Sequence, residues 1–115
     1  MAWTVEFYES QEEGCPVQDF LLSLDKAKRA KVLGLIKLLE EQGPTLPFPY
    51  SSQVRGKIRE LRTQYSKEHY RVLYFGASSR TFVLLHAFAK RTQTTPETDI
   101  RQAEKRMKTF LERRA

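Results

Sequence analysis

The spacing of apolar residues changes once along this chain, and that change constrains the fold more than any other feature. In residues 16–42 the apolar side chains recur every three or four positions, as in Val17, Leu21 and Leu24, which is typical of amphipathic helices. From Val54 onward they alternate, which is typical of strands with a buried face. Helices followed by a block of strands predict an α+β fold.

Capping and turn residues give the boundaries of the expected elements. Residues 2–8 alternate and predict a first strand, and Pro16 suits the first turn of a helix. Asp25 is the expected N-cap of a second helix, which Gly43 ends. Residues 44–53 contain three prolines and predict an extended surface loop. The remaining expected elements are strands over residues 57–63, 69–76 and 80–89 and a last helix with Thr95 as its N-cap.

The resulting order of elements is β-α-α-β-β-β-α. Short connections between the three later strands favour antiparallel pairing. The strand at 80–89 is apolar on both faces and is therefore expected inside the sheet. A length of 115 residues favours a single domain, residues 1–115. The sequence thus predicts an α+β domain with a mostly antiparallel sheet and its helices packed on one face.

Composition argues against several classes of protein. No run of about 18 apolar residues is present, so no membrane span is expected. Residues 1–14 have no secretory pattern, so a cytoplasmic location is the expectation. Cys15 is the single cysteine, and His69 and His86 have no ligand partner at metal-binding spacing, so neither a metal nor another cofactor is expected. His86 lies mid-strand among apolar residues and is interpreted as a buried, hydrogen-bonded histidine rather than a general base.

Charge is distributed unevenly along the chain, whose formal net charge is +6. Residues 1–54 hold five basic and eight acidic side chains, whereas residues 55–115 hold fifteen basic and six acidic ones. Nine of the basic residues lie in 55–91, together with only Glu60 and Glu68. A basic half of a folded domain indicates a polyanionic partner, most commonly a nucleic acid, although a solvated basic surface is the simpler alternative.

With helices on one face, the other face of the sheet is expected to be open and cationic. The residues expected there are Lys57, Arg59 or Arg62, Arg71, Lys90 and Arg91. Interleaved tyrosines, Tyr65, Tyr70 and Tyr74, would add stacking surfaces, which suits single-stranded RNA. Each tyrosine taken singly is equally compatible with a place in the core. The alternation does not assign the faces of 58–62, because each side carries one cation and one apolar residue.

Four segments in a fixed order resemble the RelE-like toxins of bacterial toxin–antitoxin pairs, most closely the phage-derived branch with HigB-type toxins. The segments are VRGKIRELR at 54–62, HYRVLYF at 69–75, FVLLHAFAKRTQTTP at 82–96 and DIRQA at 99–103. The resemblance implies a RelE-like fold and a ribosome-dependent endoribonuclease that cleaves mRNA. It also implies mRNA and the ribosome as targets and a cognate antitoxin as a protein partner.

The resemblance also assigns candidate site residues. Arg71 occupies the place of an active-site arginine, and Lys90 and Arg91 occupy that of basic catalytic residues at the end of a strand. Further candidates for contacts with RNA are Lys57, Arg59, Arg62 and His69. A tyrosine that several members carry after the final strand is absent here, where Thr92 and Gln93 stand instead, so the general base stays unassigned.

Two other functions are compatible with the same pattern. ParE-like proteins share the fold type and inhibit DNA gyrase without catalysis, but they have no need of a clustered cationic groove. A module that binds RNA or an antitoxin without any activity is the third possibility. Cations on the last helix, such as Arg101 and Lys105, suit an acidic antitoxin segment or ribosomal RNA and equally an ordinary solvated surface.

Overall fold

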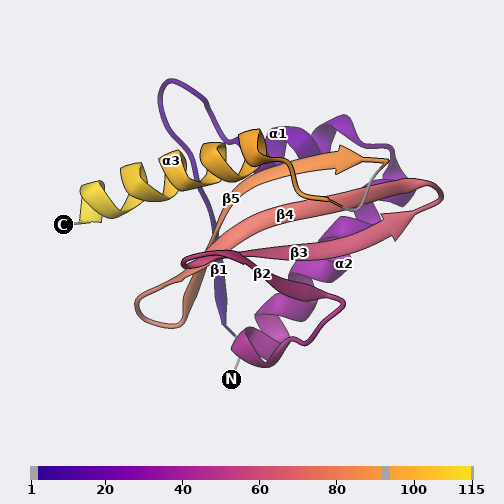
Figure 1. Cartoon of the computed structure of the whole chain (residues 1–115), viewed down its shortest axis with the longest axis horizontal. Coiled ribbons are helices and arrows are strands. Elements are labelled where there is room, and N and C mark those ends of the chain that lie inside the picture. Colours follow the sequence, from indigo (N-terminus) through magenta and orange to yellow (C-terminus); the bar gives the residue numbers. More distant parts are fainter. Residues whose placement is uncertain (1–2, 92–93, 115) are drawn as a thin grey trace.

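A five-stranded sheet forms the middle layer of the computed structural model, which describes residues 3–91 and 94–114 (Figure 1). The strands are β1 (Thr4–Phe7), β2 (Ser51–Arg55), β3 (Ile58–Tyr65), β4 (Glu68–Ala77) and β5 (Thr81–Lys90), in the spatial order β1-β5-β4-β3-β2. β1 pairs with β5 in parallel, and the other pairs are antiparallel. The predicted α+β class, the mostly antiparallel sheet and the interior place of β5 are confirmed.

Two helices between β1 and β2 form the layer on one side of the sheet. They are α1 (Pro16–Ser23) and α2 (Lys26–Gln42), followed by the short 3-10 helix η1 (Gly43–Thr45). Asp25 caps α2 as predicted, because its carboxylate accepts the Lys28 N–H at 3.0 Å. Gly43 ends α2 with φ at +58°, and a Cβ there would collide with the Trp3 indole. The first two helices therefore have the boundaries that the sequence predicted.

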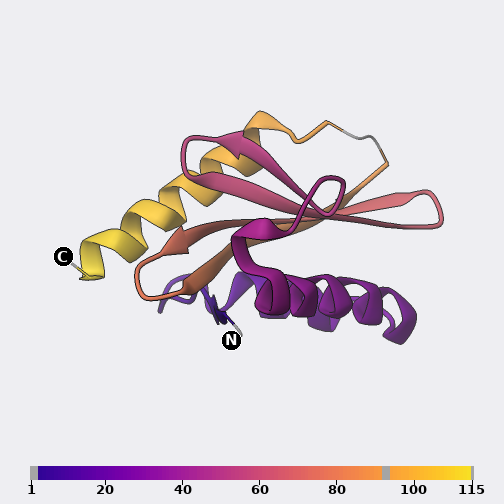
Figure 2. The ribbon, with the colours of Figure 1, turned by 90° about the horizontal axis from the view of Figure 1, so that it is seen from below.

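The third helix, α3 (Glu97–Arg114), lies on the opposite side of the sheet (Figure 2). The prediction that all helices pack on one face is therefore wrong. The cause is that β4 is apolar on both faces: Val72 and Tyr74 pack toward α1 and α2, whereas Leu73 and Phe75 pack toward α3. Burying both faces needs helices on both sides.

Two further boundaries differ from the prediction. The expected loop over residues 44–53 ends earlier, because β2 begins at Ser51 and pairs with β3. α3 begins at Glu97, and the Thr95 hydroxyl does not serve as its N-cap but donates to Glu60 Oε1 at 2.6 Å. Thr95 thereby joins the start of α3 to β3.

Candidate active site

A pocket of about 260 Å³ lies on the α3 side of the sheet, at the end of β3 and the start of β4. Pairing of β3 with β4 places Arg62 opposite Arg71 and Gln64 opposite His69. The loop before β2 closes one wall. The residues that line the pocket are Pro49, Tyr50, Arg62, Thr63, Gln64, His69 and Arg71. Three of the predicted site residues therefore converge on one hollow.

Arg71 lies deepest among these cations, with only 3% of its surface exposed. Its Nη1 donates to the Tyr70 carbonyl at 3.2 Å, and its Nε lies 3.7 Å from Glu60 Oε1. Burial, chiefly, and the charge of Arg62 lower the pKa of Arg71, whereas Glu60 opposes that change. A guanidinium with a lowered pKa is still protonated at neutral pH, so the pocket wall carries a fixed positive charge.

Glu60 is the residue of this site that sequence reasoning missed. It is 6% exposed, and its carboxylate lies between two guanidiniums, 3.8 Å from Arg62 Nε and 3.7 Å from Arg71 Nε. With the Thr95 hydroxyl as a further donor, Glu60 fixes both arginine side chains in place. Glu60 and Arg62 are two positions apart and therefore share one side of the strand, and this spacing is the sequence signal that could have identified Glu60. Two cations around one carboxylate leave this wall net positive.

Lys90 lies next to the pocket because its neighbour on the adjacent strand, His69, lines the pocket. β5 pairs with β4 so that Lys90 is opposite His69. The Lys90 ammonium donates to the Thr94 carbonyl at 3.0 Å, which turns it toward the segment after β5. Arg91 is exposed just past the end of β5, and Thr92 and Gln93 lie outside the described residues. Lys90 is therefore adjacent to the pocket through its strand partner His69, whereas Arg91 does not line the pocket.

The remaining predicted cations lie elsewhere. Arg59 pairs with Tyr74 across the strands, and its guanidinium donates to Ser51 Oγ at 3.1 and 3.2 Å, on the side of α1 and α2. Lys57 is exposed in the turn between β2 and β3, five residues along the chain from Arg62. Of the two alternatives Arg59 and Arg62, it is therefore Arg62 that shares the face of Arg71, and neither Arg59 nor Lys57 lines the pocket.

Two of the three tyrosines proposed for base stacking belong to the core. Tyr70 is 1% exposed and Tyr74 is 2% exposed, both against α1 and α2. Burial and a hydrogen bond to Glu68 raise the pKa of Tyr70 to about 12. The stacking role is therefore wrong for both, whereas Tyr65 is exposed near the end of β3.

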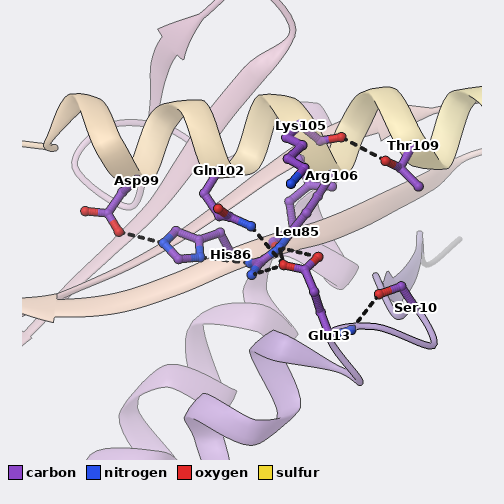
Figure 3. A network of polar contacts seen from close by, with 9 residues as sticks. All are labelled: Ser10, Glu13, Leu85, His86, Asp99, Gln102, Lys105, Arg106 and Thr109. Atoms are coloured by element: carbon purple, nitrogen blue, oxygen red, sulfur yellow. Dashed lines mark hydrogen bonds and ion pairs between the residues drawn. The ribbon is translucent and has the colours of Figure 1, made fainter.

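His86 belongs to a separate polar network between β5, α3 and the loop after β1 (Figure 3). Arg106 Nη1 donates to His86 Nδ1 at 2.9 Å, so the neutral ring carries its proton on Nε2, which donates to Asp99 at 2.6 Å. Burial and the charge of Arg106 lower the pKa of His86, against the opposing effect of Asp99. His86 is thus a hydrogen-bonded structural residue, as the sequence indicated. A larger hollow of about 940 Å³ beside this network is lined by residues of the loop and α3 and by none of the predicted site residues.

Replacing His86 with glutamine is expected to flatten the pH dependence of stability in mildly acidic solution. In the wild type the unfolded chain takes up a proton near the ordinary histidine value of 6.5, whereas the folded chain does so only at lower pH. The contribution of neutral His86 to the free energy of unfolding is therefore complete above pH 6.5. It falls as the pH drops from 6.5 through the folded pKa, by up to about 1.4 kcal/mol per pH unit. Urea unfolding between about pH 5 and 7 measures the slope. A His86→Gln slope equal to that of the wild type would contradict this expectation. Thr109→Ala is the control, on the face of α3 that carries Arg106, and it should keep the wild-type slope.

No helix in 3–91 or 94–114 is long and apolar enough to cross a membrane. Over the same residues, no group of three or more His, Cys, Asp and Glu side chains is arranged to hold a metal ion.

Comparison with known proteins identifies the family to which a chain with this fold and this cationic pocket belongs. Residues 19–108 match the family described as phage derived protein Gp49-like, so the chain belongs to that family. Two curated relatives are both named probable endoribonuclease HigB1, from Mycobacterium tuberculosis strains CDC 1551 / Oshkosh and ATCC 25618 / H37Rv. Each is 33% identical over 107 residues, which covers 91% of this chain and 82% of the relative. The resemblance to RelE-like toxins of the phage-derived, HigB-type branch is confirmed.

Proposed function

We propose that this protein is the toxin of a toxin–antitoxin pair, an endoribonuclease that cleaves mRNA on the ribosome. The observation that carries the proposal is the convergence of Arg62, His69 and Arg71 on one pocket, with Lys90 next to it. The relatives named probable endoribonuclease support the same activity. Action on translating ribosomes places the protein in the cytoplasm.

The chemistry suited to such a pocket is attack by the 2′-hydroxyl of a ribose on the adjacent phosphorus. The hydroxyl loses its proton to a base, the new O2′–P bond forms, and the P–O5′ bond breaks. The leaving O5′ takes a proton from an acid, which leaves a 2′,3′-cyclic phosphate and a 5′-hydroxyl. In this proposal the fixed charges of the pocket stabilise the phosphorane, so the step needs no metal ion.

The pocket residues have distinct proposed roles in this step. Arg71 presents a planar fork of donors to the phosphate oxygens, and Arg62 adds a second guanidinium held by the same carboxylate. His69 and Lys90 lie opposite each other on neighbouring strands and are the candidates for proton transfer. The imidazole of His69 can accept or donate a proton, which suits either direction of transfer.

Partner proteins follow from the same proposal. A toxin that cleaves mRNA must be masked in the resting cell, so a cognate antitoxin is the expected partner. The cations of α3 that point to solvent are candidates for contacts with an acidic antitoxin segment or ribosomal RNA. Exposed examples are Arg101 and Lys105.

A translating extract tests the proposal. The purified protein is added to two messages that differ only in the start codon, and primer extension maps the breaks. We expect breaks in the translated message and none in the untranslated one, with 5′-hydroxyl ends that polynucleotide kinase labels without prior phosphatase. Intact messages would contradict the proposal and favour a module that only binds. In growing cells, arrest with DNA synthesis lost before translation would favour a gyrase inhibitor.

A further inference from the structure

The loop before β2 presents two aromatic side chains at the mouth of the cationic pocket. Phe48 is 68% exposed and Tyr50 is 46% exposed, and Tyr50 lines the pocket. The Arg62 guanidinium lies over the Phe48 ring, with its carbon 5.0 Å from the ring centroid. One arginine thus contacts an open aromatic ring, the buried carboxylate of Glu60 and the pocket.

The backbone of this loop is held in place although its aromatic side chains are exposed. Leu46 is 3% exposed and anchors the loop in the core beneath α2. The N–H groups of Tyr50 and Ser51 both donate to the Pro47 carbonyl, at 3.0 and 3.1 Å. The Arg62 N–H donates to the Tyr50 carbonyl at 2.8 Å, which ties the loop to β3. A flat ligand would therefore meet a ring whose backbone is already ordered, which lowers the entropic cost of binding.

The place of these rings distinguishes them from ordinary exposed apolar residues. Among the described residues the exposed aromatic side chains are Phe48, Tyr50 and Tyr65. Tyr65 pairs with Glu68, whose carboxylate contacts Lys28 of α2, so Tyr65 belongs to the other side of the sheet. Phe48 and Tyr50 alone stand beside the arginines that would hold a phosphate. A ring with an adjacent guanidinium is a combination that stacks unpaired bases.

We propose that Phe48, with Arg62, forms a stacking platform for a nucleobase of the message next to the cleaved phosphate. The proposal rests on the proposed function and gives the pocket a base-binding subsite. Stacking of one base on an aromatic ring is typically worth about 1–3 kcal/mol, or roughly 5- to 150-fold in affinity. Because a purine offers a larger face than a pyrimidine, the platform would favour a purine at that position.

Cleavage of messages on programmed ribosomes tests the platform. The messages differ only in the bases flanking the cut, and KM and kcat are compared for the wild type and for Phe48→Ala, Phe48→Leu and Phe48→Trp. We expect Phe48→Ala and Phe48→Leu to raise KM about 5- to 150-fold on the purine message and to lose the preference for purine. Phe48→Trp should restore both, because tryptophan has a stacking face and leucine does not. Tyr65→Ala is the matched control and should behave as the wild type.

Each other outcome identifies what has failed. Wild-type rates for Phe48→Ala would overturn the platform and leave the proposed function intact. An equal loss on every message would also overturn it. A loss that does not depend on the bases of the message would mean that Phe48 stacks on a base of the ribosome instead. Failure of the wild type to cut any message would overturn the proposed function, and the platform with it. Because the ring is mostly exposed, the thermal unfolding of all Phe48 variants should match that of the wild type.

Discussion

Replacing Arg106 with alanine is expected to lower the free energy of unfolding by about 2–4 kcal/mol. The side chain is 8% exposed and reaches from α3 to three partners. Its guanidinium donates to Glu13 Oε1 at 3.0 Å, to the Leu85 carbonyl at 2.9 Å and to His86 Nδ1 at 2.9 Å. Without it, the Leu85 carbonyl and His86 Nδ1 lose this donor, and among the described residues Gln102 is the side-chain donor that the Glu13 carboxylate keeps.

Thermal and urea unfolding of Arg106→Ala measure this effect, which corresponds to a fall in melting temperature of roughly 8–16 °C for a domain of this size. Arg101→Ala is the matched control on the same helix, because its ion pair with Glu97 is exposed. That variant should change the free energy of unfolding by less than about 0.5 kcal/mol. Equal unfolding curves for Arg106→Ala and the wild type would show that the network between α3 and the loop after β1 contributes nothing to stability.

The predictable part of the fold rests on strong local signals. Asp25 and Gly43 set the ends of α2 because a side-chain cap and a positive φ each depend on residue type. β2 was missed because SSQVR has no alternating apolar pattern, and its pairing partner β3 comes later in the chain. The apolar character of both faces of β5 was visible in the sequence, but the side of the sheet that α3 covers depends on tertiary packing, which no single segment encodes.

The candidate site could be predicted in part. Arg62 and Arg71 share the pocket because cross-strand pairing brings them opposite each other, and the resemblance to RelE-like toxins had singled both out. Arg59 was grouped with them because alternation alone did not say which side of β3 faces which helix. Arg59 and Arg62 are three positions apart in β3, so their side chains lie on opposite faces of the sheet. Glu60 was overlooked because a lone carboxylate among cations looks like an ordinary strand residue until its burial is known.

Replacing Arg71 with lysine is expected to lower the rate of mRNA cleavage about 10²- to 10³-fold while the fold is kept. Lysine keeps the positive charge beside Glu60, so the buried carboxylate still has a counter-charge. It lacks the planar fork that contacts two phosphate oxygens at once, and that contact is the proposed contribution to the transition state. Circular dichroism and thermal unfolding verify that the folded state persists.

Arg59→Lys is the matched control, since it makes the same chemical change on the same sheet but on the α1 and α2 side. Its hydrogen bonds to Ser51 belong to the structure and not to the pocket. A small change in stability and a cleavage rate within about threefold of the wild type are expected.

Single-turnover cleavage of a message on programmed ribosomes measures whether the arginines of the pocket act on RNA. The predicted result is a rate about 10²- to 10³-fold below the wild type for Arg71→Lys and a nearly unchanged rate for Arg59→Lys. A folded Arg71→Lys protein that cuts the message as fast as the wild type would contradict the account.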